Sequence, residues 1–338
     1  MKIPGYHIDL EKALEIIKKN KYKLAALQVP EGLKTHISKF IEYIESKTDA
    51  QVVIYEDPCF GACDTVTPKL IDIGVDFAIQ IGHSKIPNLK ESQIPMIYVN
   101  AESDIDISKI IQKAIPHIKG KKVGIVTTTQ HIKNLGEIKL ILEKNGFEPI
   151  IGKADERIEF DGQILGCDFS SATSIKDDID MFLYVGSGNF HPLGLMLSTK
   201  KPVIIANPYD NSIRFNELKD LKDTVLRQRY GAIARSKDAK VFGILVGTKI
   251  GQQRIDLANK IKEMLDSKNK KSYMIASNFF NPANLETFRD IDCFVSTACP
   301  RIAIDDYMRY KTPIITPVEL EILLGVKKWD DYCFDEIS

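Results

Sequence analysis

Three cysteines far apart in the chain each lie in a loop of small residues next to a strand-like apolar run. They are Cys63 in Asp57-Pro-Cys-Phe-Gly-Ala-Cys63-Asp, Cys167 in Gly162-Gln-Ile-Leu-Gly-Cys167-Asp, and Cys299 in Ser296-Thr-Ala-Cys299-Pro-Arg301. Thiolates are ligands of zinc and of iron–sulfur clusters, and small neighbours let a bulky group approach the backbone. The three loops could therefore place three thiolates around one inorganic centre.

The spacing of the cysteines leaves two interpretations open. The close pair, Cys59 and Cys63, has the form Cys-x3-Cys, whereas structural zinc sites typically use Cys-x2-Cys pairs. The Cys-x3-Cys-x2-Cys run of a conventional radical enzyme is also missing from the sequence. A shared metal centre therefore competes with buried structural thiols in related domains. Burial is the prediction for Cys293, inside an apolar run, and for Cys333.

The composition is that of an ordinary soluble globular protein with two or three domains. Of its 338 residues, 44% are apolar and 27% are charged, and one hydrophobic core rarely serves so long a chain. The 46 basic and 46 acidic side chains cancel, which argues against a non-specific nucleic-acid binder, since such proteins carry a basic excess. We see neither a secretory signal nor a membrane span, so we expect a cytoplasmic location, reduced thiols and no membrane partner.

The sequence carries weak self-similarity at a period of about a hundred residues, which is longer than the period of a solenoid repeat. In each copy an aspartate, Asp76, Asp180 or Asp292, precedes a short apolar run that ends in small residues. Further along each copy a proline leads into another apolar run. The prolines are Pro95, Pro202 and Pro313. Apolar runs also open the three copies, at residues 24–32, 123–130 and 241–247.

The pattern after each opening run indicates a parallel α/β fold. Amphipathic helices are predicted over residues 35–46, 135–145 and 253–268, where apolar residues recur at three and four positions. Buried strands that alternate with helices indicate a parallel sheet covered on both faces. We predict three similar small α/β domains from triplication, each a roughly four-stranded, mainly parallel sheet flanked by helices. The predicted domains are residues 1–104, 105–212 and 213–338. Such sheets bind ligands beyond the carboxyl ends of their strands, where the small-residue loops fall.

None of these loops is a nucleotide-binding fingerprint, because neither Gly-x-Gly-x-x-Gly nor a Walker lysine motif is present. A series of ordered motifs nevertheless points to one family. The motifs are Asp57-Pro-Cys-Phe-Gly-Ala-Cys63-Asp, Gly82-His83-Ser84, Thr127-Thr-Thr-Gln-His131, Gly162-Gln-Ile-Leu-Gly-Cys167, Gly186-Ser-Gly-Asn-Phe-His-Pro-Leu-Gly194, Ala298-Cys-Pro-Arg-Ile-Ala-Ile-Asp-Asp-Tyr307 and Thr316-Pro-Val-Glu-Leu-Glu-Ile-Leu-Leu-Gly325. In these motifs the chain resembles, essentially over its whole length, the catalytic subunit of diphthamide synthase in its archaeal single-gene form.

The resemblance implies a 4Fe-4S cluster whose ligands map onto Cys63, Cys167 and Cys299, with one iron left open for S-adenosylmethionine. It implies that the reduced cluster breaks the methionine-side carbon–sulfur bond and yields a 3-amino-3-carboxypropyl radical and methylthioadenosine. The implied acceptor is a histidine of translation elongation factor 2, in the first step of diphthamide biosynthesis. A homodimer and an electron donor are implied as well. Cys59 is then an extra thiol, because Cys63 is the cysteine that follows the shared Gly-Ala.

Several loop residues are candidates for holding S-adenosylmethionine. Arg301, two residues after Cys299, could bind its carboxylate as a bidentate partner, or could pair with Asp305 or Asp306 instead. The loop of Gly186, Ser187 and Gly188 could donate hydrogen bonds, or could be only a tight structural turn. Further candidates come from the equivalent loops of the first and third copies. They are Gln28, Pro30, Glu31, Gly32, Gln252 and Arg254.

Three histidines, His83, His131 and His191, also follow strand-like segments. Such a histidine can act as an acid, a base or a ligand, but is more often a hydrogen-bonded structural residue. Two other functions compete with the cluster enzyme. One is a non-enzymatic protein that binds zinc or no metal and holds a translation factor. The other is an electron-transfer or small-molecule α/β enzyme that uses the loops without a metal.

Overall fold

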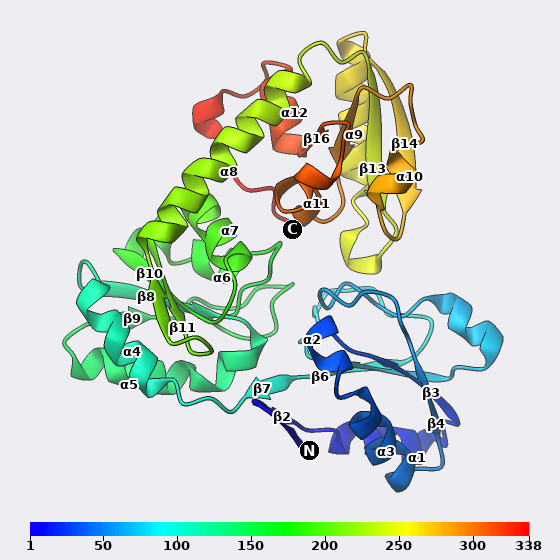
Figure 1. Ribbon diagram of the computed structural model, residues 1–338, viewed down its shortest axis with the longest axis vertical. Coiled ribbons are helices and arrows are strands. Elements are labelled where there is room, and N and C mark those ends of the chain that lie inside the picture. Colours follow the sequence, from blue (N-terminus) through cyan, green and yellow to red (C-terminus); the bar gives the residue numbers. More distant parts are fainter. Residues whose placement is uncertain (338) are drawn as a thin grey trace. The chain divides into compact units, whose positions relative to one another are not determined.

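The computed structural model describes residues 1–337, and they form two compact units. Unit 1 comprises Met1–Ile164, Ser170–Ser187 and Ile204–Ile213, and unit 2 comprises Leu165–Phe169, Gly188–Val203 and the chain from Arg214 onward. The loop that carries Cys167 therefore belongs to unit 2, although the chain on both sides of it belongs to unit 1. Mainly parallel sheets with flanking helices make up the fold, as predicted (Figure 1).

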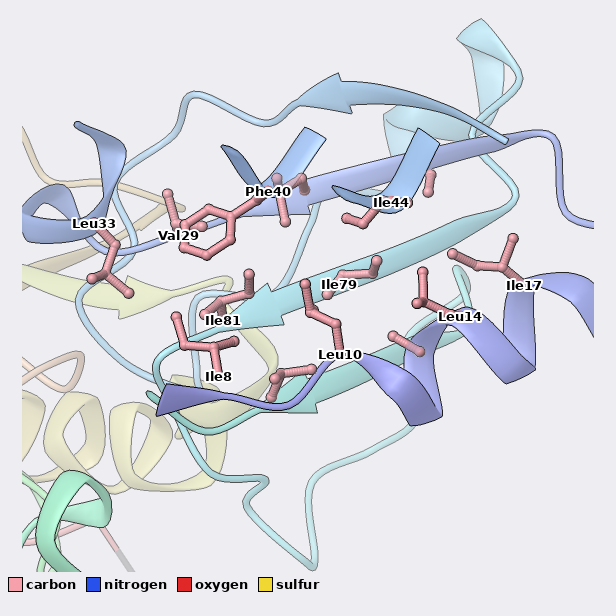
Figure 2. Close-up of a cluster of buried hydrophobic side chains, with 14 of the residues drawn as sticks. Ile8, Leu10, Leu14, Ile17, Val29, Leu33, Phe40, Ile44, Ile79 and Ile81 are labelled. Carbon is pink, nitrogen blue, oxygen red and sulfur yellow. The ribbon is translucent and has the colours of Figure 1, made fainter. Parts of the chain in front are cut away.

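The first sheet lies in unit 1 and has the order β4-β3-β5-β6, with each neighbouring pair parallel. Its strands are β3 (Leu24–Gln28), β4 (Gln51–Ile54), β5 (Phe77–Ile81) and β6 (Met96–Val99). Three helices accompany these strands, α1 (Glu11–Asn20), α2 (Glu31–Lys34) and α3 (Ile37–Lys47). The buried residues Ala13, Leu14 and Ile17 give α1 one apolar face, because side chains three and four positions apart share a face. Figure 2 shows this face, and that of α3, directed at the strands.

A small antiparallel sheet, β1-β2-β7, also lies in unit 1 and was not predicted from the sequence. Its strands are β1 (Lys2–Ile3), β2 (Tyr6–Ile8) and β7 (Ala101–Ser103). Strands of two or three residues are too short to show a period of two. They are therefore invisible to a reading of hydrophobic patterns.

The second sheet has five strands in the order β12-β11-β10-β8-β9, one more than predicted. Its strands are β8 (Lys122–Thr127), β9 (Glu148–Ile150), β10 (Met181–Val185), β11 (Val203–Asn207) and β12 (Ser212–Arg214). The neighbouring helices in the chain are α4 (Ser108–Ala114), α5 (Leu135–Lys144) and α6 (Ser170–Thr173). A Cβ at Gly124 would lie 2.6 Å from the ring of Phe182. Glycine is thus required in β8 so that the aromatic ring of β10 can lie against it.

The third sheet lies in unit 2 and has the order β14-β13-β15-β16, again with parallel pairs. Its strands are β13 (Val241–Gly247), β14 (Lys271–Ser277), β15 (Cys293–Ser296) and β16 (Ile314–Ile315). The helices of unit 2 are α7 (Phe190–Thr199), α8 (Asn216–Arg235), α9 (Ile255–Ser267), α10 (Pro282–Leu285), α11 (Arg301–Ile304) and α12 (Pro317–Leu323). The predicted helices correspond to α3, α5 and α9, with ends that differ by at most two residues.

The three aspartates of the predicted repeat, Asp76, Asp180 and Asp292, have the same role in the three larger sheets. Each carboxylate accepts hydrogen bonds from two consecutive backbone N–H groups where the opening strand begins. The donors are Lys23 and Leu24 for Asp76, Lys121 and Lys122 for Asp180, and Lys240 and Val241 for Asp292. The recurrence agrees with the predicted repeat. Its origin by triplication, and the predicted domain boundaries, stay predictions.

A membrane span would need a long apolar helix. Among residues 1–337 we find none that is long and apolar enough to cross a bilayer.

Candidate metal centre

Cys63 lies in the loop between β4 and the 3₁₀ helix Pro68–Ile73, on the carboxyl side of the first sheet. The Asp64 carboxylate accepts hydrogen bonds from the backbone N–H groups of Phe60 and Gly61, at 2.7 and 2.9 Å. A Cβ at Gly61 would lie 3.6 Å from Cys63 Sγ. The loop therefore folds back on Asp64, with the Cys63 side chain half-buried beside the glycine.

Polar side chains of β5 and β6 hold the Cys63 loop against the first sheet by hydrogen bonds. Gln80 in β5 donates through Nε2 to the Asp64 carbonyl at 2.8 Å and to Gln28 Oε1 at 3.0 Å. The Tyr98 hydroxyl of β6 donates to the Ala62 carbonyl at 3.1 Å. Gln28, a predicted substrate-binding residue, is 1% exposed, and its side chain supports the Cys63 loop through Gln80.

Cys59 lies in a different environment from Cys63. It is buried, and its Sγ lies 3.7 Å from Nδ1 of His83. Burial lowers the pKa of His83 to about 4, so this imidazole is neutral at pH 7. Cys59 thus faces a half-buried, neutral histidine, whereas Cys63 lies nearer to the surface.

Cys167 lies at the tip of a tight turn in unit 2. The Leu165 N–H donates to the Asp168 carbonyl at 3.0 Å, and the two residues form an antiparallel bridge. A Cβ at Gly166 would come within 2.7 Å of Phe190 Cε1. Glycine at this position is what lets the turn lie against the aromatic ring, with Cys167 half-buried.

Cys299 lies between β15 and α11, on the carboxyl side of the third sheet. The backbone N–H and the hydroxyl of Thr297 both donate to the Leu245 carbonyl, at 3.0 and 2.9 Å. The Cys299 carbonyl accepts from the Ile302 N–H at 3.1 Å, which begins the turn of α11. Cys299 is half-buried as well.

Phe190, the first residue of α7, lies between the Cys167 loop and the Cys299 loop. One edge of its ring lies against Gly166. The guanidinium carbon of Arg301 lies 4.8 Å from its ring centroid. Because Gly166 precedes Cys167 and Arg301 follows Cys299 by two residues, two of the three predicted ligands come from neighbouring loops of one unit.

The third predicted ligand, Cys63, belongs to unit 1, whereas Cys167 and Cys299 belong to unit 2. Within residues 1–337, no group of three or more His, Cys, Asp or Glu side chains forms a ready metal site. The joining of all three cysteines around one centre therefore stays a prediction.

The remaining cysteines differ from these three. Cys293 is fully buried in β15, its Sγ lies 3.3 Å from Ser236 Oγ, and burial raises its pKa to about 12. This confirms the prediction of a buried structural thiol. Cys333 was also expected to be buried, but it is only half-buried, with a pKa that burial raises.

The Gly186-Ser187-Gly188 loop follows β10 and has the geometry of a constrained turn. Gly186 and Gly188 have φ angles of 151° and 75°, which favour glycine. The Gly186 N–H donates to the Ala206 carbonyl at 3.1 Å, and the Ser187 carbonyl accepts from the Tyr184 hydroxyl at 3.2 Å. The structural role is therefore present, and a role in substrate binding stays a prediction.

The alternative to substrate binding for Arg301 was an ion pair with Asp305 or Asp306, and the pair with Asp305 is present. Arg301 Nε donates to Asp305 Oδ2 at 2.9 Å, in a partly exposed ion pair. Asp306 pairs with Arg309 instead, at 3.4 Å. Among residues 1–337 the Arg301 side chain makes one hydrogen bond, through Nε, and its two Nη groups therefore remain available to a carboxylate.

Two predicted candidates of the third copy lie beside the Cys299 loop. Gln252 is buried in a short 3₁₀ turn, Ile250–Gln252. Arg254 is fully engaged with its neighbours. It donates to the carbonyls of Thr297 and Ala298, at 2.7 and 3.2 Å, and forms a bidentate pair with Asp335, at 2.9 and 2.7 Å. It therefore holds the Cys299 loop in place.

The weaker candidates of the first copy lie at the start of α2. Pro30 is the residue before the helix, and Glu31 pairs with Lys34 at 2.7 Å on the surface. Gly32 has open space around it. Within residues 1–337, no hydrogen bond or ion pair joins any of the three to a predicted ligand loop.

The histidines fit the expected hydrogen-bonded structural role only in part, because neither ring nitrogen of His131 makes a hydrogen bond within residues 1–337. His131 is buried, and burial lowers its pKa to about 4. His191 lies beside the Cys167 turn, where its Nε2 would be 3.6 Å from a Cβ at Gly166. The spacing of these two histidines in the sequence does not indicate a function for either of them.

Comparison with known proteins identifies the family. The model of the diphthamide synthesis protein family matches residues 29–333. The chain belongs to this family. The resemblance seen in the sequence motifs is thereby confirmed.

Named relatives align with almost the whole chain. The 2-(3-amino-3-carboxypropyl)histidine synthase of Pyrococcus horikoshii is 35% identical, over 98% of this chain and 94% of its own length. The protein of the same name from Methanocaldococcus jannaschii is 32% identical, over 98% and 94%. Subunit 1 of the Schizosaccharomyces pombe synthase is 27% identical, over 97% of this chain and 76% of its own length.

A solved structure agrees with the fold. The crystal structure of Dph2 from Pyrococcus horikoshii with a 4Fe-4S cluster matches with a TM-score of 0.89 and 35% identity. The match covers 98% of this chain and 94% of that protein. The α/β architecture described above is therefore the architecture of the family.

Proposed function

We propose that this chain is a 2-(3-amino-3-carboxypropyl)histidine synthase. It transfers the 3-amino-3-carboxypropyl group of S-adenosylmethionine to a histidine of translation elongation factor 2, in the first step of diphthamide biosynthesis. The observation that carries the proposal is the 35% identity to the Pyrococcus horikoshii synthase across 98% of the chain. The match covers all three cysteine loops.

The donor chemistry of these loops fits a 4Fe-4S cluster. Cys63, Cys167 and Cys299 are half-buried thiols in loops of small residues, and thiolates are the usual ligands of such clusters. Cys293 is unsuited by comparison, because its raised pKa disfavours the thiolate. A relative with 35% identity has been crystallised with a 4Fe-4S cluster. We assign Cys63, Cys167 and Cys299 as its ligands here.

When bound, the reduced cluster would supply the electron that breaks the methionine-side carbon–sulfur bond of S-adenosylmethionine. The chain would orient that substrate. Arg301 is suited to hold the carboxylate, since its Nη groups are available and the ring of Phe190 lies against its guanidinium. Ser187 and Gly188 would add backbone donors after β10, and Gly186 would shape their turn. Gln28 would act through the Cys63 loop that it supports, and Gln252 is a further candidate from the third copy.

The proposal includes three partners. Translation elongation factor 2 is the protein substrate, an external reductant donates the electron, and a second copy of the chain completes a homodimer. We place the reaction in the cytoplasm, where the thiols stay reduced.

Cluster binding is tested by changing the cysteines one at a time. Cys63→Ser, Cys167→Ser and Cys299→Ser should each lower the iron and sulfide bound after anaerobic reconstitution, since each removes one thiolate. Cys293→Ser is the matched control, because its thiol is buried in a strand, and it should retain the metal content of the unchanged chain. Full iron content in all three loop variants, or a colourless zinc protein with full transferase activity, would contradict the assignment.

A further inference from the structure

A short segment after Cys333 connects the two cysteine loops of unit 2. We call Phe334–Ile337 the strap. The letter C in Figure 1 marks the end of the chain that the strap precedes. All of the contacts described below lie within unit 2.

The strap first holds the Cys167 loop. The Ile337 N–H donates to the Cys167 carbonyl at 2.8 Å. The Glu336 carboxylate accepts from the Phe169 N–H at 2.9 Å. The buried ring of Phe334 makes an edge-on contact with Phe169, with 5.5 Å between the ring centroids. The turn that carries Cys167 is thus bound through its backbone and its aromatic side chain.

The same strap holds the Cys299 loop through Arg254. Asp335 forms the bidentate pair with Arg254, and the Glu336 carbonyl accepts from Arg254 Nη1 at 3.2 Å. The remaining donors of Arg254 bind the carbonyls of Thr297 and Ala298, directly before Cys299. One guanidinium therefore ties the strap to the residues that position this thiol.

An aromatic contact of Phe334 gives a second connection between the Cys167 loop and the Cys299 loop. Phe334 also packs on Phe190, with 6.1 Å between the ring centroids. Phe190 in turn lies between Gly166 and Arg301. Every residue of the strap thus contacts the Cys167 turn, the support of the Cys299 loop, or both.

We propose that the strap is a positioning element that fixes the Cys167 and Cys299 loops relative to each other, with Arg254, Phe334 and Asp335 as its positioning residues. This inference rests on the proposed function, in which both thiols bind one cluster. Two ligands held at a fixed separation need no reordering when the cluster binds, so less binding free energy is lost. In this proposal the strap residues act through the loops, by the contacts described above.

The test is cysteine labelling of the full-length chain before reconstitution. Iodoacetamide alkylation rates are measured for each cysteine by peptide mass, in Arg254→Lys, Asp335→Asn and Phe334→Leu. Cys63 is an internal reference in unit 1, and the buried Cys293 reports any general unfolding of unit 2. Arg309→Lys, Asp266→Asn and Phe279→Leu are matched controls, because their side chains lie on the surface of the same unit.

Arg254→Lys and Asp335→Asn should each speed the labelling of both Cys167 and Cys299 by about tenfold, since losing a hydrogen bond to a charged group shifts a local equilibrium by about that much. Phe334→Leu should speed both by about two- to tenfold, since it removes the aromatic contacts with Phe169 and Phe190. Cys63 and Cys293 should label at unchanged rates, and the controls should match the unchanged chain. After reconstitution, the strap variants should lose iron to a chelator faster and show an altered electron paramagnetic resonance spectrum of the reduced cluster.

The inference is overturned if only one of the two loop cysteines responds, if neither responds, or if Cys293 is labelled equally fast. The last result would make the strap a general stabiliser of unit 2. Failure of the proposed function looks different, because the unchanged chain would then bind no 4Fe-4S cluster. The labelling result would still decide whether the strap couples the two loops.

Discussion

The fully buried ion pair between Arg229 and Glu319 offers a sharp test of how unit 2 is held together. Arg229 Nε and Nη2 bind the Glu319 carboxylate at 2.7 and 2.5 Å, and both side chains are fully buried. Arg229 also donates to the carbonyls of Ala303 in α11 and Ile314 in β16. It therefore connects α8 to the helix that begins after Cys299.

Replacing Arg229 by Met leaves a buried carboxylate without its partner charge. Breaking a buried pair in this way costs about 3–5 kcal/mol. Glu319 keeps hydrogen bonds from the Thr316 N–H at 2.9 Å and the Tyr332 hydroxyl at 3.2 Å, which stabilise its charge in part. We therefore expect a loss near the lower end, about 3 kcal/mol of unfolding free energy.

Unfolding in guanidinium chloride, followed by tryptophan fluorescence, measures this loss of unfolding free energy. Trp329 is the only tryptophan of the chain and lies 4.9 Å from Tyr332, centroid to centroid, so it reports on unit 2. The double variant Arg229→Met/Glu319→Gln should lose about 2 kcal/mol less than the sum of the single changes, because neutralising Glu319 removes the isolated charge. Lys262→Met, which breaks an exposed pair, should change stability by no more than about 0.5 kcal/mol.

Two results would refute this reasoning. The first is a loss below about 1 kcal/mol in Arg229→Met, a value typical of exposed pairs. The second is additivity of the two single changes in the double variant. Either result would mean that the carboxylate is solvated or protonated in the folded chain.

Three further predictions concern His131, Asp292 and Gly166. His131 has a pKa lowered to about 4 by burial, so stability should fall as the pH drops from 6.5 towards 4, and His131→Phe should remove about 2 kcal/mol of the loss between pH 6.5 and 5 in urea unfolding. Backbone N–H donors lower the pKa of Asp292, so the charged carboxylate stabilises the fold above about pH 4 and this stabilisation is lost below that pH. Asp292→Asn should therefore lower the free energy of unfolding by about 1 kcal/mol at pH 7. An equal loss at pH 7 and pH 3 would contradict this. Gly166→Ala should cost about 1–3 kcal/mol through its clash with Phe190, whereas Gly136→Ala, which has open space in α5, should be neutral or stabilising.

The parallel strands and their helices were predictable because hydrophobic period and chain length determine them locally. The recurring Asp76, Asp180 and Asp292 were visible in the sequence, and the structure adds the reason, since each carboxylate binds the start of an opening strand. The three-stranded antiparallel sheet and α8 left no such signal. The strands are too short to show a period, and charged residues, including the buried Arg229, interrupt the pattern of α8.

The candidate site was predictable only in part. Cysteines in loops of small residues can be identified from the sequence as candidate metal ligands, and the ordered motifs indicate the family. The contacts that hold the loops are not local. Arg254 looked like a substrate-binding residue, because no pattern connects it with Asp335, 81 positions later in the chain. Phe334 and Glu336 carry no motif, and only the fold brings them to the Cys167 turn.

The central claim is that the chain cleaves S-adenosylmethionine on its methionine side. The direct measurement is to incubate the reconstituted, reduced chain with S-adenosylmethionine and identify the nucleoside product by mass spectrometry. We predict methylthioadenosine, formed together with a fragment from the 3-amino-3-carboxypropyl group or with modified elongation factor 2, and its loss in Cys63→Ser, Cys167→Ser and Cys299→Ser. Formation of 5′-deoxyadenosine instead, or equal methylthioadenosine in the cysteine variants, would contradict the account.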